Sequence, residues 1–174
     1  MRSGRPWAMS FAIRPVSPGD VPSVVALVHE LAAYERAADQ CSLADDQLRS
    51  ALFGESAALF GHVATVDDDP VGCALWFLNF STWRGVHGIY LEDLFVQPSH
   101  RGRGIGRALL VELARECVAR GYARLEWAVL DWNEPAIGFY RSLGAAPQDE
   151  WTTFRLEGQS LFKLCDAGGR APAQ

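Results

Sequence analysis

The chain has 174 residues, enough for one domain with a full hydrophobic core and too few for a second enzymatic domain. Hydrophobic residues make up 49% of the sequence and charged residues 21%, a composition that is typical of globular proteins and argues against general disorder. The net charge of −5 argues against a general nucleic-acid binder, because such a protein needs a positive footprint over much of one face.

Cysteine spacing and the length of apolar runs exclude further classes. The four cysteines, at positions 41, 73, 117 and 165, show no C-x-x-C spacing, so neither a zinc site nor a disulfide framework is predicted, and no metal is expected. No apolar run reaches the ~20 residues of a membrane span, and residues 1–10 lack the apolar core of a signal peptide. We therefore expect a cytoplasmic protein that binds no membrane, with a disordered leader at 1–10, a single domain at 11–165 and a loose tail at 166–174.

The first half of the chain is predicted to form a strand at 11–16, a helix ending at about Tyr34, a helix at 45–53, and a hairpin of strands at 62–66 and 71–80. The segment Ser17-Pro18-Gly19-Asp20 is typical of a helix start, since it offers a capping hydroxyl, a proline for the first turn and an acid near the positive helix end. Val24, Leu27 and Leu31 then recur at helical spacing. Between the hairpin strands, residues 67–70 read Asp-Asp-Asp-Pro, which indicates a turn.

The second half is predicted to contain a strand at 86–96, a loop at 97–102, a helix at 105–120, a strand at 123–130, a short helix at 135–143, and one or two closing strands at 151–156 and 161–164. Gly121 and Gly144 end the two helices. Antiparallel hairpins before a strand–helix–strand unit indicate an α/β layer fold with a mixed sheet.

Residues 101–107, Arg-Gly-Arg-Gly-Ile-Gly-Arg, follow a predicted strand and open a helix. Glycines let backbone N–H groups approach phosphate oxygens, the helix start adds roughly half a positive charge, and three arginines surround the turn, so an anion site is predicted. The Walker pattern G-x-x-x-x-G-K-[ST] is absent. A dinucleotide fingerprint also fails, because Arg107 stands where its third glycine belongs and no clear ribose-binding acid follows about 20 residues on.

The R-G-x-G-x-G form, after a strand that carries an acid, resembles the pyrophosphate loop of the GNAT superfamily of acyl-CoA N-acyltransferases. Residues 133–144, NEPAIGFYRSLG, resemble the second signature of that superfamily, N-x-x-A-[IV]-x-F-Y-x-x-x-G. The segments ELAAYE at 30–35, YLED at 90–93 and WNEP at 132–135 are similar to the branch of spermidine/spermine (diamine) and thialysine acetyltransferases. The resemblance covers about residues 11–157.

The resemblance implies a GNAT-like α/β fold, in which a mixed, mostly antiparallel sheet with a splayed central strand pair is flanked by helices. It implies acetyl-CoA as the co-substrate, a small-molecule amine as the acceptor and, by analogy with the polyamine enzymes, a two-fold homodimer. The implied cofactor contacts are Leu94, Phe95 and Val96 for the pantetheine and acetyl group, Arg101, Gly102, Arg103, Gly104, Ile105, Gly106 and Arg107 for the pyrophosphate, and Asn133, Glu134, Pro135 and Ala136 for the far arm. The implied amine contacts are Tyr34, Glu35, Glu92 and one of Asp149 or Glu150.

The expected chemistry needs a base and an acid. An aliphatic ammonium has a pKa of ~10.4, so its deprotonation at pH 7 costs about 4.6 kcal/mol. Glu92, two residues before the expected acetyl position, is the predicted base, acting directly or through water. Tyr140 matches the tyrosine whose hydroxyl lies near the thioester sulfur in the family, and is the predicted acid for the departing thiolate. No cysteine lies in the two motifs, which favours direct transfer in a ternary complex over an acetyl-cysteine route.

Two other functions stay open. A peptide or protein N-acetyltransferase would be favoured by an open acceptor cleft. A non-catalytic acyl-CoA-binding regulatory module would keep the glycine turn but have no reason to keep Glu92 and Tyr140 together. Among amines, the few acids at 36–39 favour a shorter acceptor such as thialysine over a long polyamine, and Glu126 stands where the diamine enzymes carry histidine.

Overall fold

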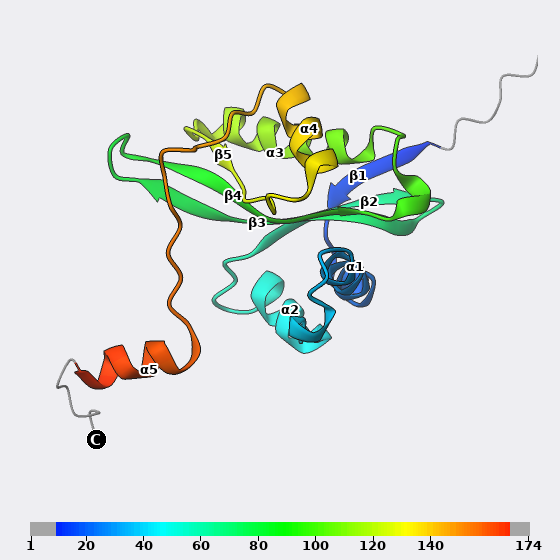
Figure 1. Ribbon diagram of the computed structural model, residues 1–174. Helices are drawn as coiled ribbons and strands as arrows, with labels where there is room; N and C mark the ends of the chain where they lie inside the picture. The colour runs from blue at the N-terminus through cyan, green and yellow to red at the C-terminus, as the bar shows by residue number, and fades with distance from the viewer. Residues whose placement is uncertain (1–9, 168–174) are drawn as a thin grey trace, which may run out of the picture. The chain divides into compact units, whose positions relative to one another are not determined.

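The computed structural model describes residues 10–167 (Figure 1), so the predictions of a disordered leader and of most of a loose tail fall on residues 1–9 and 168–174, outside this range. The chain divides into two compact units, Met1–Ala128 and Val129–Gln174. The expectation of one domain over 11–165 stays a prediction.

The first unit is built on a five-stranded sheet whose strands lie side by side in chain order. They are β1 (Phe11–Pro15), β2 (Phe60–Val66), β3 (Asp69–Ser81), β4 (Val86–Val96) and β5 (Leu125–Glu126). Strands β1 to β4 pair antiparallel, whereas β4 and β5 pair parallel, and only at residues 89–90 of β4. Beyond Tyr90, β4 has no strand on its β5 side within the described residues. The predicted mixed, mostly antiparallel sheet with a splayed strand pair is confirmed.

Helices cover both faces of this sheet (Figure 1). Helices α1 (Val21–Tyr34) and α2 (Asp45–Phe53) lie on one face, and α3 (Ile105–Arg120) lies on the other, close to the predicted ranges. The α1 face holds a core of buried side chains from Val24, Leu27, Leu48, Val63, Cys73, Leu75 and Phe95. On α3, the residues at 105, 109, 113 and 117 form one buried stripe. Full burial of a leucine stabilises the fold by about 1.5–3 kcal/mol, so the core on the α1 face and the buried stripe of α3 hold these helices on the sheet.

The turn between β2 and β3 is tighter than predicted. Val66 lies opposite Asp69, so Asp67 and Asp68 alone form the turn. Both residues have positive φ, 50° and 68°. Two successive left-handed residues make a type I′ turn, whose twist matches that of the flanking strands, and aspartate tolerates this region better than most side chains do.

Strand β4 contains one extra residue, Glu92. Leu75 of β3 lies opposite Asp93, but the next residue, Trp76, lies opposite Leu91, so Glu92 has no partner. Such a bulge interrupts the alternation of side chains along the strand. Leu91 therefore shares a face with Trp76, whereas Asp93 shares the α1 face with Leu75. The bulge places a carboxylate on the face that α1 covers.

The second unit contains α4 (Glu134–Ser142) and α5 (Gly158–Ala167). Helix α4 begins within one residue of the predicted start. Its N-cap is Asn133, whose side-chain oxygen accepts a hydrogen bond from the Ala136 N–H at 3.4 Å.

Two strand predictions are wrong. The strand expected at 123–130 is reduced to the two residues of β5, because only these have ladder partners on β4. The closing strands expected at 151–156 and 161–164 are absent from the described residues, where 151–157 is irregular and 158–167 is helix α5. Leu161, Leu164 and Cys165 have the three- and four-residue spacing of one helix face, so the apolar run has a helical period rather than a strand period.

Candidate active site

Three carboxylates from two elements are close enough to interact, and one of them, Asp93, lies on the α1 face of the sheet. Glu92 and Asp93 come from the bulged part of β4, and Glu35 follows the last residue of α1. Burial and, after it, the negative charges of Glu92 and Glu35 raise the pKa of Asp93 to about 6. Burial also raises the pKa of Glu35. We call these three residues the acid group. Glu35 and Asp93 are partly buried, Glu92 is exposed, and carboxylates that interact in this way favour the binding of a cation.

Asp93 is the member of the acid group that sequence reasoning missed. A regular strand would place Asp93 on the same face as Leu91, and only the bulge at Glu92 separates them. The available signal was an adjacent pair of acids inside an otherwise apolar strand. A carboxylate in such a strand costs free energy to bury unless it has a partner or a function.

Arg101 is held on the α1 side of the sheet. Its Nε donates to the Val96 carbonyl at 2.8 Å, and its guanidinium carbon lies 4.8 Å from the ring centroid of Tyr34 and 5.4 Å from that of Phe95. Cation–π contacts at such partly exposed positions contribute about 0.5–1 kcal/mol. Arg101 thus joins the end of β4 to the end of α1, and its predicted role at the pyrophosphate stays a prediction.

The glycine-rich turn has a backbone that suits an anion. Gly102 and Gly104 have positive φ, 75° and 83°, and Gly104 is the N-cap of α3. Glycine adopts these angles without strain. The first N–H groups of α3 have no acceptor within the helix and lie at its positive end. With Arg103 and Arg107 exposed beside it, the turn can hold the phosphates of a nucleotide cofactor.

The three residues predicted to meet the pantetheine and acetyl group alternate at the end of β4. Phe95, opposite Cys73, is buried in the α1-face core. Leu94 and Val96 belong to the other face and are half-buried. No strand pairs with β4 on its β5 side beyond Tyr90 in residues 10–167, so backbone groups along this edge have no ladder partner on that side.

The second motif lies in the second unit. Asn133 is buried as the cap of α4, and Glu134 and Pro135 are exposed in its first turn. Tyr140 is half-buried on α4, with its ring centroid 5.3 Å from that of Phe139. Asp149 and Glu150, the candidates for the late amine contact, are exposed in the irregular segment after α4. Because the two motifs belong to different units, their joint action stays a prediction.

The cysteines give no support to a covalent acetyl-cysteine route. Cys73 and Cys117 are buried, and burial raises the pKa of both thiols, which disfavours the nucleophilic thiolate. Cys41 and Cys165 lie outside both motifs. Within residues 10–167, no group of three or more histidine, cysteine or acidic side chains could hold a metal ion, and no helix is long and apolar enough to cross a bilayer.

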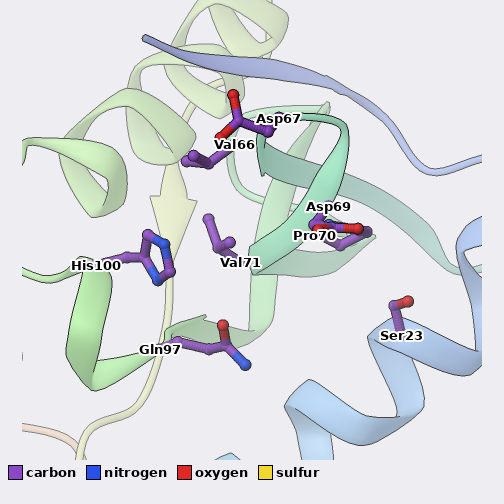
Figure 2. A pocket seen from close by; sticks show the side chains of 8 residues that line it. All are labelled: Ser23, Val66, Asp67, Asp69, Pro70, Val71, Gln97 and His100. Carbon is purple, nitrogen blue, oxygen red and sulfur yellow. The ribbon is translucent and has the colours of Figure 1, made fainter. Parts of the chain in front are cut away.

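An open pocket of about 420 Å³ lies at the tip of the β2–β3 hairpin (Figure 2). Asp67 and Asp69 of the turn, Ser23 of α1, and Gln97 and His100 of the segment after β4 contribute polar groups to it. None of the residues predicted to contact acetyl-CoA or the amine lines this pocket. It is therefore not the site that the two motifs predict.

Comparison with known proteins decides the family. Residues 25–145 match the model of the acetyltransferase (GNAT) family. The chain belongs to the GNAT family. This GNAT acetyltransferase is 36% identical over 163 residues to the thialysine N-epsilon-acetyltransferase of Bos taurus, a match that covers 87% of this chain and 95% of the relative.

Further relatives of this GNAT acetyltransferase have related names. The L-ornithine N5-acetyltransferase NATA1 of Arabidopsis thaliana is 29% identical, with 86% of this chain and 85% of the relative covered. The human spermidine/spermine N(1)-acetyltransferase-like protein 1 is 31% identical, with 88% of this chain and 24% of the relative covered. Among solved structures, an integron cassette protein from the mobile metagenome of V. cholerae matches with a TM-score of 0.76 at 29% identity, covering 91% of this chain and 99% of that one. The predicted family resemblance and the prediction of an N-acetyltransferase are confirmed.

Proposed function

We propose that this enzyme transfers an acetyl group from acetyl-CoA to the primary amine of a small cationic molecule, by direct transfer in a ternary complex. The observation that carries the proposal is the acid group of Glu35, Glu92 and Asp93, close to the place where β4 and β5 part. The relatives named for thialysine and for ornithine point to a terminal amine on the side chain of an amino acid, and the spermidine/spermine relative keeps a polyamine as the alternative.

The acid group would bind the ammonium and then accept its proton. Transfer from an ammonium of pKa ~10.4 to a carboxylate of pKa about 6 costs about 6 kcal/mol, compared with about 9 kcal/mol for an aspartate of ordinary pKa. The raised pKa of Asp93 therefore lowers the cost of proton transfer by about 3 kcal/mol. Asp93 is proposed to share the role predicted for Glu92, directly or through water.

The residues of the glycine turn fit the cofactor. When bound, acetyl-CoA supplies the activated acetyl group. The left-handed Gly102 and Gly104 leave the start of α3 open to the pyrophosphate, and Arg103 and Arg107 would add positive charge. Asn133 and Tyr140 are proposed, from the family correspondence, to hold the pantetheine arm and to protonate the departing thiolate.

An acetyl-transfer assay at pH 8 tests the proposal with thialysine, ornithine, spermidine, glutamate and a lysine-containing peptide as acceptors. We expect transfer to the first three and little to glutamate, because an extra carboxylate is repelled by the acid group. Glu92→Gln and Asp93→Asn should each raise KM for the amine without altering acetyl-CoA binding, and Glu55→Gln, which replaces an exposed acid just after α2, is the matched control. Transfer only to neutral or acidic amines would contradict the cationic-acceptor proposal.

We also propose a cytoplasmic two-fold homodimer, by analogy with the polyamine enzymes. Trp151, Phe154 and Phe162 of the second unit are largely exposed, and large apolar side chains grouped along one segment are typical of a surface that a partner covers. Light scattering at micromolar concentration should give twice the mass of the chain, and a monomeric mass would contradict this assignment.

A further inference from the structure

Three polar side chains meet at the β5 edge of the sheet. Asn79 of β3 donates through Nδ2 to Glu126 Oε2 of β5 at 2.6 Å. Arg124, just before β5, places its Nε 2.7 Å from the same carboxylate oxygen. Between them lies Gly88 of β4, the residue opposite Asn79. We call Asn79, Arg124 and Glu126 the edge cluster.

Gly88 is what allows the edge cluster to form. A Cβ at this position would lie 2.6 Å from Asn79 Oδ1 and 2.8 Å from Arg124 Cγ, closer than such atoms approach. Without a side chain at position 88, Asn79 reaches across β4 to contact Glu126 on the far side. The edge cluster therefore needs a residue without a side chain at position 88 of β4.

Two buried polar atoms of the edge cluster lack a hydrogen bond among residues 10–167. Asn79 Oδ1 and Arg124 Nε are buried and have no hydrogen-bond partner within the described residues, so the close approach of Arg124 to Glu126 is an ion pair without hydrogen-bond alignment. Leaving a buried polar atom unpaired costs about 1–3 kcal/mol. The Arg124 and Glu126 side chains as wholes are 39% and 38% exposed, so a polar ligand can reach both. Arginine has five N–H donors, and most of them stay available to such a ligand.

The edge cluster shares the α1 face with the acid group. Side chains alternate along β3, so Asn79 lies on the same face as Leu75, which is opposite Asp93. Glu126 pairs with Tyr90, two residues before Glu92. Strand geometry puts Glu126 and Glu92 ~6.6 Å apart along β4 and ~4.8 Å apart across the sheet, a separation of about 8 Å, and Arg124 lies two residues farther from Glu92 along the chain.

The surface between the two groups is apolar. Phe77 and Tyr90 lie opposite each other on this face, with ring centroids 5.2 Å apart, and both are half-buried. An acceptor that spans from the edge cluster to the acid group would therefore have polar ends and an aliphatic stem.

We propose that Arg124 and Glu126 bind the head group of an α-amino acid, with Arg124 on its carboxylate and Glu126 on its α-ammonium, while its side-chain amine lies at the acid group. The proposal deepens the proposed function and rests on it. An extended lysine-like side chain spans about 6 Å from the α-carbon to the terminal nitrogen, which fits the separation of about 8 Å between Glu126 and Glu92 and leaves the α-carboxylate to extend toward Arg124. Arginine suits a carboxylate because its planar fork matches both oxygens. A zwitterionic head group adds one charge of each sign and leaves the pair balanced.

The test compares three acceptors that differ only at the head group: thialysine, its methyl ester, and bis(2-aminoethyl) sulfide, which is thialysine without its carboxylate. For Arg124→Gln, we expect KM for thialysine to rise about 10- to 100-fold, the loss of a hydrogen bond to a charged group, with kcat changed less than about twofold. KM for the sulfide diamine should stay unchanged, because this acceptor has no carboxylate. Arg115→Gln removes a similarly ion-paired arginine from α3, on the other face, and should change neither KM.

The outcomes separate the two proposals. Equal rises of KM for thialysine and the diamine, or no rise for either, would overturn the head-group site and leave the amine acetyltransferase standing. A wild-type enzyme that acetylates none of the three acceptors would contradict both. Calorimetry that shows no acetyl-CoA binding by Arg124→Gln would indicate that this variant is misfolded. In that case the test is the comparison of thialysine with its methyl ester in the wild-type enzyme. Its KM should be at least about tenfold higher for the methyl ester than for thialysine, although the acid group favours the more cationic ester, and an equal or lower KM would overturn the site.

Discussion

Replacing Asp93 with asparagine should stabilise the protein at neutral pH and should do so less as the pH falls. Asp93 has its pKa raised from 3.8 to about 6 by burial and by the charges of Glu92 and Glu35. A raised carboxyl pKa means that the fold favours the protonated form, so ionisation costs stability above the folded-state pKa and costs nothing below the unfolded-state pKa. The full cost is about 2 pKa units at 1.36 kcal/mol each, or about 3 kcal/mol. Asparagine removes this cost.

The magnitude has a defined pH dependence. Asp93→Asn should be more stable than wild type by about 3 kcal/mol at pH 8 and by about 1 kcal/mol at pH 4.5, since most of the change falls between pH 4 and 6. Urea unfolding at both pH values measures the two differences. Asp39→Asn replaces an exposed acid and should stay within about 0.5 kcal/mol of wild type. A difference for Asp93→Asn that is independent of pH, or a destabilised variant at pH 8, would refute the assignment of a desolvated Asp93 within the acid group.

Three further predictions concern the neighbouring parts of the site. Gly88→Ala should destabilise the fold by about 1–3 kcal/mol, because the added methyl group overpacks the edge cluster. Asn79 Oδ1 is the atom nearest to that methyl group, so the double variant with Asn79→Ala should lose less stability than the sum of the two single variants. Additive losses in urea unfolding would contradict this coupling. Arg101→Ala should lower thermal stability, because it removes the contacts with Tyr34 and Phe95, whereas Arg103→Ala should mainly weaken acetyl-CoA binding in a salt-dependent way. Calorimetry at two ionic strengths distinguishes the two effects. A loss of acetyl-CoA affinity for Arg101→Ala alone would show instead that Arg101 binds the pyrophosphate. Tyr140→Phe should lower kcat about 10²–10⁴-fold in the acetyl-transfer assay, with acetyl-CoA affinity unchanged. An unchanged kcat would contradict the role of Tyr140 as the acid and leave it only a packing role.

Helices α1 to α4 and the β2–β3 hairpin could be predicted because their signals are local. The buried stripe of α3 and the glycines at both of its ends are visible in the sequence, and the structure bears them out. The wrong strand at 161–164 misread a local helical spacing, whereas the wrong strand at 123–130 concerns a property that depends on partners distant in sequence. The segment 123–130 has the composition of a strand, but a strand exists only where it pairs with a neighbour, and the ladder partners on β4 cover only Leu125 and Glu126.

The candidate site follows the same division. The left-handed glycines of the turn could be predicted, because their requirement is local to the backbone. Asp93, Arg124 and Asn79 could not be assigned, because their surroundings depend on a bulge and on a contact between β3 and β5 that crosses β4. The direction of the Arg101 side chain also could not be predicted from the sequence, since an arginine beside a glycine turn can reach either face of the sheet.

The extra residue in β4 ties the chemistry of this enzyme to the opening of its sheet. A bulge increases the local twist of a strand, and the bulge at Glu92 lies two residues beyond the last pairing between β4 and β5. The same insertion therefore turns Asp93 toward α1 and helps to steer β4 away from its neighbour. Substitutions at 92 or 93 can retune the charge while the gap remains. Deletion of residue 92 would reverse the inside–outside phase of half the strand and favour a continuous, closed sheet, so acidity and access would be lost in a single step.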